Sequence, residues 1–418
     1  MSWDKVKLAD CCLSISDGDH QPPPKAVSGV PFVTIANINK SNQFDFSDTM
    51  FVPKDYYDRL DSKRKAQVGD ILYSVVGSFG IPVLIKEERP FVFQRHIAIL
   101  RPNERINSAF LYYTMLSRDF YAKADAAAIG AAQRTVSLTS LRGMEIELPP
   151  LKVQEAIASK LSVYDNLIEN NQKQIKLLEE AAQRLYKEWF VDLRFPGYED
   201  TPIVGGVPEG WEKVPVGNLI SYEIGGGWGE ETPTGKCIRE AYVIRGTDLY
   251  GIAHGDLLSI PFRYHVESNL SSRKLKDGDI VFEVSGGSRT EGVARCLLIT
   301  SSMLNVWRKD VMCASFCKLI RPQFGFSQYL HDCIKHLRAT GKTEEYDKRS
   351  ASSIVNYRWK DFLSQELVLR PSEEILDHYN GVAKEIYSKA INCSLQIESA
   401  KKARDRLLPK LMSGEIEV

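Results

Sequence analysis

The sequence predicts an α+β protein with two tandem mixed α/β domains separated by two long helices, a pseudo-two-fold duplication. Short landmarks of the first half recur in the second, each half is rich in strand-like runs, and each half ends in a heptad pattern typical of a long helix. The recurring landmarks are Trp3–Val6 with Trp211–Val214, Gly69–Leu72 with Gly278–Val281, Arg101-Pro102 with Arg321-Pro322, and Ile175–Leu178 with Ile397–Ala400. The separation grows from 208 residues (3 to 211) to 222 (175 to 397), as insertions and deletions produce in a tandem repeat.

Composition is typical of a soluble globular protein and favours a cytoplasmic location. The 418 residues suit two to three domains, with 43% hydrophobic and 26% charged residues. No apolar run approaches the roughly 18 residues of a membrane span, the first residues lack a signal-peptide pattern, and the eight Cys indicate cytosolic thiols. The net charge of 0 is unusual for a nucleic-acid binder, so any basic surface is local or is supplied by a partner.

Residues 1–150 form the first predicted domain. Apolar runs bounded by Gly and Pro predict strands over 32–35, 70–76 and 97–100. A helix is expected over 108–121 with Ser108 as its N-cap. A last strand over 145–148 ends at Pro149-Pro150, because proline cannot continue the ladder.

The apolar spacing then changes to alternating steps of three and four, which predicts a long helix within 151–196. One heptad position holds Leu161, Ile168, Ile175, Ala182 and Trp189, and the other holds Tyr164, Asn171, Leu178 and Leu185. Asn171 is a polar interruption of the kind that fixes register at some cost in stability. Pro196-Gly197 ends the pattern, and residues 197–210 are predicted to be a linker.

The second half repeats this plan as a domain over 211–371 and a helix over 372–418. Strands are predicted over 241–244, 279–282 and 315–320, and a helix over 327–337. Ser372 is the expected cap of the C-terminal helix. Its predicted seam, with one extra four-residue step before Ala390, consists of Tyr379, Val382, Ile386, Ala390, Cys393, Ile397, Ala400, Arg404, Leu407 and Leu411.

Two seams of equal length can pack on each other as an intramolecular coiled coil. A helix over 153–190 would extend about 57 Å, which is too long for one face of a small domain. The alternative is that each seam packs separately on its own globular region.

Patterns that resemble a nucleotide or metal site are incomplete. The segment 229–237 looks like a phosphate loop, but it has five residues between its glycines, Cys237 follows Lys236 where Ser or Thr is needed, and Pro233 removes a backbone donor. A zinc site from Cys313, Cys317, His331, Cys333 and His336 would lack the usual Cys pair spacing, so buried thiols are expected. No nucleophile triad, dinucleotide fingerprint, methyltransferase tetrapeptide or nuclease pattern is present, so neither catalytic residues nor a metal site are predicted.

Polar, glycine-rich loops occur at equivalent places in both halves. Arg, Lys, Asn, Gln and His can read base edges or hold phosphates, although surface loops are polar in any case. The candidates in the first half are Asp19, His20, Asn37, Asn39, Lys40, Ser78, Gln94, Arg95, His96, Gln133 and Arg134. Those in the second are Trp228, Arg245, Thr247, Asp248, Ser288, Arg289, Arg308, Lys309, Lys348, Arg349 and Ser350, with Arg245, Lys348 and Arg349 expected as the counterparts of Gln94-Arg95-His96.

Motifs around the helices resemble those of type I restriction-modification specificity subunits. The similar segments are Glu147–Ala158, Leu185–Gly197, Val207–Trp211 and Leu407–Ile416, and weaker landmarks are Gly69–Leu72 and Gln94-x-His96. The first similar segment has no close copy at its second occurrence, where Arg370–Glu374 replaces Pro150–Gln154.

The resemblance implies two target-recognition domains that each read one half of a split DNA sequence. It implies helices that pair antiparallel, set the gap between the half-sites and dock two methyltransferase subunits. Double-stranded DNA and restriction subunits, which are ATP-driven translocases and nucleases, are the other implied partners, and no membrane is involved. S-adenosylmethionine, ATP and Mg²⁺ are expected on partner subunits, and none on this chain. The expected coiled-coil and docking residues are Leu161, Ile168, Asn171, Ile175, Leu178, Leu185, Trp189, Ile386, Ile397, Leu407 and Leu411.

Two other classes of protein remain as alternatives. One is a coiled-coil scaffold that presents two protein-binding modules, and DNA retention with and without a methyltransferase would separate it from a DNA reader. The other is an autonomous enzyme, which the incomplete motifs oppose.

Overall fold

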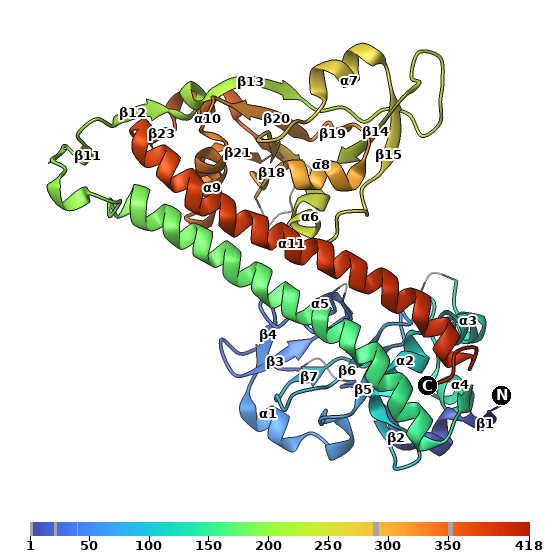
Figure 1. Cartoon of the computed structure of the whole chain (residues 1–418). Coiled ribbons are helices and arrows are strands. Elements are labelled where there is room, and N and C mark those ends of the chain that lie inside the picture. Colours follow the sequence, from blue (N-terminus) through green and yellow to red (C-terminus); the bar gives the residue numbers. More distant parts are fainter. Residues whose placement is uncertain (1–2, 21–22, 40, 132, 287–291, 350–353) are drawn as a thin grey trace. The chain divides into compact units, whose positions relative to one another are not determined.

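The computed structural model describes residues 3–20, 23–39, 41–131, 133–286, 292–349 and 354–418. The chain divides into two compact units (Figure 1). Unit 1 contains Met1–Asn166 together with Lys401–Val418, and unit 2 contains Leu167–Ala400. Both long helices contribute to both units, so each unit is described by itself.

Unit 1 contains a four-stranded sheet, a three-stranded sheet and a pair of terminal strands. Its strands are β1 Asp4–Lys7, β2 Cys12–Asp17, β3 Val30–Val33, β4 Met50–Val52, β5 Ile71–Ser74, β6 Pro82–Leu84, β7 Val92–Phe93, β8 Ile97–Pro102 and β9 Glu145–Leu148. Its short helices are α1 Lys54–Arg59, α2 Ser108–Leu116, α3 Arg118–Ala127 and α4 Leu138–Gly143. The long helices are α5 Leu151–Tyr186 and α11 Glu373–Met412.

Unit 2 repeats these sheets and adds short strands. Its strands are β10 Ile203–Val204, β11 Val207–Pro208, β12 Glu212–Pro215, β13 Ile220–Gly225, β14 Arg239–Ile244, β15 Phe262–His265, β16 Ile280–Glu283, β17 Ser285–Gly286, β18 Cys296–Leu298, β19 Val311–Cys313, β20 Cys317–Pro322, β21 Asp347–Arg349, β22 Val355–Tyr357 and β23 Leu367–Arg370. Its short helices are α6 Leu249–Ala253, α7 Glu267–Arg273, α8 Ser301–Trp307, α9 Ser327–Ala339 and α10 Trp359–Gln365. The segment predicted to be a linker contains the small hairpin β10–β11.

The two units share one topology, which confirms the predicted α+β class and the duplication. The four-stranded sheets have the orders β2-β8-β5-β6 and β13-β20-β16-β18, and the three-stranded sheets have the orders β4-β3-β7 and β15-β14-β19. The terminal strands also correspond, because β1 pairs with β9 and β12 pairs with β23. A register irregularity recurs between Cys12 and Ser14 and between Ile220 and Tyr222.

The predicted helix over 108–121 was wrong in its continuity and in its cap. The Asn107 side chain, rather than that of Ser108, accepts the Phe110 amide at 3.0 Å and starts α2. Ser117 then adopts an extended conformation and caps α3 through the amide of Phe120. Two local caps therefore divide the segment. Each cap side chain accepts the backbone amide three residues later, and a new helix starts there.

Helix α5 buries the seam that its heptads predict. Leu161, Ile168, Ile175 and Ala182 are all buried, and the helix ends in a π-helical turn, Lys187–Val191. Asn171 is buried too, and its amide nitrogen has no hydrogen-bond partner among the described residues. Asn171 therefore costs stability at a position where an apolar side chain would not.

Helix α11 buries a row that differs from the predicted one in its first turns. Val382 is 39% exposed, whereas Ala383 is fully buried. The inward row steps by four from Tyr379 to Ala383 and Tyr387, because both tyrosine hydroxyls donate to the buried carboxylate of Asp332 on α9. Ile386 is consequently only half-buried, and the predicted row is regained at Ala390.

The two long helices pair antiparallel within each unit (Figure 1). In unit 1, Leu161 of α5 shares a hydrophobic core with Leu408 and Leu411 of α11. In unit 2, the Trp189 ring after α5 lies 5.8 Å from the ring of Tyr379. Both cores also include side chains from the sheets, so the helices pack on each other and on the globular modules together.

Candidate nucleic-acid interface

In unit 1, several strand ends meet at one edge of the sheets. The Asp19 amide donates to Phe93 O at 2.9 Å, and the Arg95 amide donates to Asp19 O at 3.0 Å. The Gln94 amide donates to Val33 O at 3.3 Å. These bonds join the segments that follow β2, β3 and β7.

Two further loops join the same edge. The Val75 amide donates to His96 O, and the Gly77 amide donates to Arg134 O, both at 2.9 Å. Val76 also pairs with Thr135. We call this set of segments edge 1, and it comprises residues 18–20, 34–37, 75–79, 94–96 and 129–135, as far as they are described.

Unit 2 builds the corresponding edge with the same backbone bonds. The Val284 amide donates to Phe316 O at 2.9 Å, as Val75 does to His96. Ser285 pairs with Asn356, as Val76 does with Thr135. Edge 2 comprises residues 226–227, 245–248, 284–286, 314–316, 347–349 and 354–357.

Glycine is required where both edges begin. A Cβ atom on Gly18 would lie 2.2 Å from Phe93 O, and one on Gly226 would lie 2.1 Å from Ala314 O. Only glycine permits such close backbone approach. The turn that follows β7 therefore corresponds to the turn that follows β19.

This correspondence corrects one prediction. The counterparts of Gln94-Arg95-His96 are Ala314-Ser315-Phe316, not Arg245, Lys348 and Arg349. Arg245 instead corresponds to Thr34, because each precedes a 3-10 turn closed by a side chain three residues later. Lys348 and Arg349 lie in β21, in register with Asn356 and Val355 of β22.

Several predicted residues hold the loops of the edges in place. Asn37 Oδ1 accepts the Thr34 amide at 2.8 Å, and Asp248 Oδ2 accepts the Arg245 amide at 2.9 Å. Asn39 Oδ1 accepts the amides of two later loop residues. Thr247, within the second 3-10 turn, is exposed. The amides and carboxylates that cap these turns are thus already engaged.

Asp19 and Arg245 already have polar partners, Asp19 on helix α1 and Arg245 within its own turn. The buried Asp19 carboxylate accepts the hydroxyl of Tyr56, and burial together with this hydrogen bond raises the pKa of Tyr56 to about 12. The Arg245 guanidinium makes two hydrogen bonds to Asp248, at 2.7 and 2.9 Å. Releasing Arg245 toward a ligand would therefore break an existing ion pair.

Several other predicted side chains of the edges face solvent, whereas Gln94 and His96 are half-buried. His20, Ser78, Arg95 and Gln133 are exposed on edge 1, and Lys348 and Arg349 are exposed on edge 2. Arg134 is exposed as well, pairs with Asp125 and lies 5.4 Å from the Phe79 ring centre. These cationic, amide and hydroxyl groups suit contacts to phosphates and base edges.

Other predicted residues lie apart from these edges. Arg308 and Lys309 precede β19 at the opposite end of its sheet from Arg245, and Lys309 pairs with Glu240. Trp228 begins a loop beside β15 and has Arg263 over its ring at 4.7 Å. Lys40, Ser288, Arg289 and Ser350 lie outside the described residues.

Sequence reasoning missed two residues on edge 2. Phe316 is 55% exposed at the start of β20, where its neighbours in sequence suggested a continuous strand. Asn356 is exposed between the buried Val355 and Tyr357. The short alternation Val-Asn-Tyr was the available signal for a strand there.

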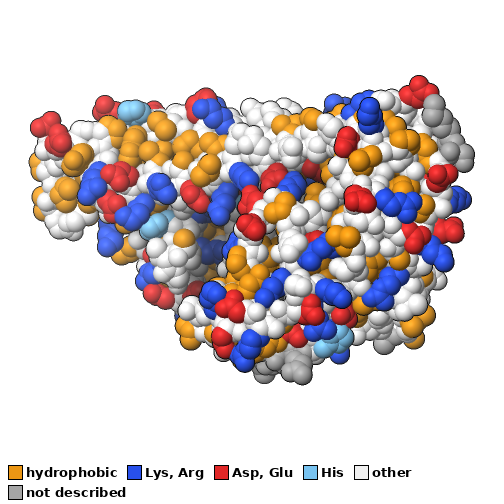
Figure 2. Space-filling model, turned by 90° about the horizontal axis from the view of Figure 1, so that it is seen from below, with side chains coloured by type: hydrophobic (Ala, Val, Ile, Leu, Met, Phe, Trp, Pro, Cys, Tyr) orange, Lys and Arg blue, Asp and Glu red, His pale blue; other side chains and the backbone are white. Residues whose placement is uncertain are grey.

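Charge is mixed on the face shown in Figure 2, where Lys and Arg side chains alternate with Asp and Glu. The structure keeps this balance by pairing many charges locally. In unit 1, Asp165 of α5 accepts the Tyr113 hydroxyl and an Arg404 N–H, both at 2.7 Å. In unit 2, Glu179 of α5 contacts His254 and Lys335, both at 3.2 Å.

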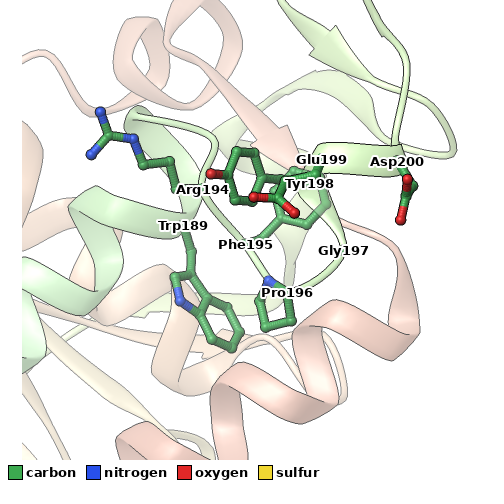
Figure 3. Close-up of a pocket in the computed structure, with 8 residues that line it drawn as sticks. All are labelled: Trp189, Arg194, Phe195, Pro196, Gly197, Tyr198, Glu199 and Asp200. Carbon is green, nitrogen blue, oxygen red and sulfur yellow. The ribbon is translucent and has the colours of Figure 1, made fainter.

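The pocket in Figure 3 follows α5 in unit 2 and has a volume of about 360 Å³. It is lined by Trp189, Arg194, Phe195, Pro196, Gly197, Tyr198, Glu199 and Asp200. Of the predicted residues, it includes Trp189 of the seam and none of the candidate DNA contacts. The pocket is therefore distinct from edge 2.

The cysteines at β19 and β20 are buried as predicted. Cys313 and Cys317 are inaccessible to solvent, and burial raises the pKa of Cys313 to about 12. Such burial is what core packing of the two thiols gives. Within the described part of the chain, no group of three or more His, Cys, Asp and Glu side chains could hold a metal ion. The described helices also include none that is long and apolar enough to cross a membrane.

The two units repeat one fold and one arrangement of loops at the edge of their sheets. Comparison with known proteins then shows what the chain is similar to. A family model described as the type I restriction modification DNA specificity domain matches residues 2–180. The type I restriction enzyme MjaIX specificity subunit of Methanocaldococcus jannaschii is 26% identical over 375 residues, which cover 84% of this chain and 78% of that protein.

A second relative matches along the full length. The putative type I restriction enzyme MjaX specificity subunit of the same organism is 26% identical over 434 residues and covers 100% of this chain and 94% of its own. The crystal structure of a type I restriction-modification S subunit from M. genitalium has the same fold, with a TM-score of 0.55, 13% identity and coverage of 98% and 96% of the two chains. Residues 2–180 therefore match the type I restriction modification DNA specificity domain, and the chain as a whole is similar to type I restriction enzyme specificity subunits.

Proposed function

We propose that the chain is the DNA sequence-specificity subunit of a type I restriction-modification complex, and that each unit reads one half of a bipartite target. The observation that carries this proposal is the repeated edge. One backbone arrangement presents His96 and Thr135 in unit 1 and Phe316 and Asn356 in unit 2. Two copies of one scaffold with different side chains at equivalent positions are suited to reading two different sequences.

The helices have two roles in this proposal. The lengths of α5 and α11 set the number of base pairs between the half-sites. The outer surface of α5 docks methyltransferase subunits, one for each half-site. Val163 and Leu177 support this role, because both are more than 60% exposed on a helix whose inner face is already packed.

The chemistry is assigned to partner subunits. S-adenosylmethionine would bind to the methyltransferase subunits, whereas ATP and Mg²⁺ would serve the complete complex with its restriction subunits. The chain itself contributes recognition and no catalytic group, and the complex works on DNA in the cytoplasm.

The test is reconstitution of the full chain with a methyltransferase subunit of a type I system. We expect sequence-selective retention of duplex DNA and methyl transfer only when both proteins are present. Methyl transfer by the pure chain alone would contradict the proposed division of labour. Partner binding without any DNA preference would favour a scaffold instead.

The docking surface has its own matched pair of variants. Leu177→Gln should weaken partner binding, whereas Lys176→Gln, at an exposed polar neighbour, should not. Equal partner affinity of the two variants would remove Leu177 from the docking surface.

A further inference from the structure

A row of side chains crosses edge 2. Ser285 pairs with Asn356 across β17 and β22, and Asn356 pairs with Lys348 across β22 and β21. Register partners in an antiparallel ladder project from the same face. The Ser285 hydroxyl donates to Asn356 Oδ1 at 2.9 Å, which places these two side chains together.

An exposed aromatic residue, Phe316, adjoins this row through its backbone. Phe316 O accepts the amides of Val284 and Ser285, at 2.9 and 3.2 Å, so its backbone adjoins β17. Two hydrogen bonds thus fix the residue that carries the ring, while the side chain stays 55% exposed. Among the described residues, its ring makes no ring–ring or cation contact, in contrast to Trp228 beneath Arg263.

The chemical groups of this row and of Phe316 suit the major groove of DNA. Phenylalanine is suited to the methyl group of thymine, an Asn amide to the edge of adenine, and Lys to guanine or phosphate. Neighbouring strands are about 4.8 Å apart and base pairs about 3.4 Å apart, so the row spans a few consecutive base pairs. Unit 1 has His96 in the place of Phe316, so this apolar contact is a feature of edge 2.

We propose that Phe316 contacts the methyl group of a thymine in the half-site read by unit 2. This proposal rests on the proposed function and deepens it, because it assigns one base and one atom group to one side chain. Phe316 is a specificity residue here, and Asn356 and Lys348 belong to the row of side chains that its backbone adjoins.

The experiment uses the full chain with a methyltransferase subunit and a library of random duplexes. Once the selected site is known, each thymine of the unit 2 half-site is replaced singly by uracil, which removes only the methyl group. At one position we expect binding to weaken about fourfold, the factor that corresponds to about 0.8 kcal/mol for one buried methyl group. Phe316→Ala should bind the thymine and uracil sites equally, and Phe316→Leu should keep part of the difference.

Phe324→Ala is the matched control, because Phe324 is fully exposed between β20 and α9, at the other end of β20. It should keep the full ratio between thymine and uracil, and the melting temperatures of all variants should match the parent. A half-site without thymine, a ratio of one at every thymine, or an unchanged ratio in Phe316→Ala would overturn the assignment of Phe316 and leave bipartite recognition standing. Failure to select any sequence would overturn the proposed function, and this assignment with it.

Discussion

Arg101 and Asp70 form a two-pronged ion pair between β8 and the start of β5. Arg101 Nε lies 3.0 Å from Asp70 Oδ1, and Nη2 lies 2.8 Å from Oδ2. Arg321 and Asp279 form the same pair in unit 2, at 2.8 and 2.7 Å. Two motifs that recur separately in the sequence, Gly-Asp-Ile and Arg-Pro, therefore contact each other in both units.

Removing the cation from this pair should destabilise unit 1. Arg101→Ala is expected to lower its free energy of unfolding by about 3–5 kcal/mol, because the Asp70 carboxylate is buried and would lose its counter-charge. Hydrogen exchange under increasing denaturant would measure the loss in unit 1. The double variant Arg101→Ala/Asp70→Asn should recover part of it. A loss below about 1 kcal/mol, as for a surface pair, would contradict this role.

A tyrosine–aspartate hydrogen bond also recurs, but with its partners exchanged. In unit 1, Tyr113 of α2 donates to Asp165 of α5 at 2.7 Å. In unit 2, Asp332 of α9 accepts from Tyr387 of α11, and Tyr387 is the residue 222 positions after Asp165. The contact between the short helix and the long helix is thus maintained although the two side chains have changed places.

The bond in unit 2 should contribute measurably to stability. Tyr387→Phe is expected to cost unit 2 about 1.5–3 kcal/mol, since it removes a hydrogen bond to a buried carboxylate. Denaturant unfolding would measure the cost. Tyr198→Phe, at a partly exposed hydroxyl in the same unit, is the control and should change little. Equal stability of the two variants would argue against the buried bond.

The contact between Glu179 and His254 should make the stability of unit 2 depend on pH. Burial opposes the charge on Glu179, but the hydrogen bond with His254 and the charge of Lys335 outweigh it and lower the pKa of Glu179 to about 2. Burial also opposes the charge on His254, but Glu179 outweighs it and raises the pKa of His254 above its ordinary value of 6.5.

The two shifts define a window for this effect. The contribution of Glu179 is present above its ordinary pKa of 4.5 and is lost as pH falls toward 2, while that of His254 is present below 6.5 and is lost as pH rises through its raised pKa. Glu179→Gln should therefore destabilise unit 2 most between pH 4.5 and 6.5. Unfolding measured across pH should show this, with the exposed Glu180→Gln as control. A difference that does not vary with pH would exclude this linkage.

Much of the fold could be predicted from heptad spacing and turn residues, because these features reflect local periodicity. The seam of α5 from Leu161 to Trp189 followed from that spacing. Helix α11 departed from it at Val382, because the inward face there is set by hydroxyl bonds to Asp332, a residue 50 positions earlier in the sequence. The spacing of apolar residues along one helix cannot predict a hydrogen-bond partner that lies on another helix.

The candidate site, too, could be predicted only in part from the sequence. Glycine-rich loops were recognisable as loops, but the predicted counterparts of Gln94-Arg95-His96 in the second half were wrong. The counterpart of His96 was missed, because it is defined by backbone bonds, from Val75 in one unit and from Val284 in the other. Phe316 has neither the polarity nor the spacing that would have distinguished it from a strand residue.

A contact of Arg95 to a base can be distinguished by experiment from a contact to a phosphate. Arg95 is exposed on edge 1, on a backbone held by Asp19 O. If it reads guanine, Arg95→Ala should lose about 1–3 kcal/mol and relax one position of one half-site. If it holds phosphate, binding should weaken evenly across sequences with a shallower salt dependence. Arg59→Ala, in α1 and outside edge 1, is the control. Parent-like binding of cognate and mismatched DNA by Arg95→Ala would exclude Arg95 from the interface.

The independence of the two units is tested most directly by exchanging one module. Residues 1–148, which end with β9, would be replaced by the corresponding region of another specificity subunit, and the methylated sites of a strain carrying the complete complex would be mapped. We expect one half-site to change to that of the donor, while the other half-site and the gap stay as they were. A change in both half-sites, or in neither, would contradict recognition by two separate edges.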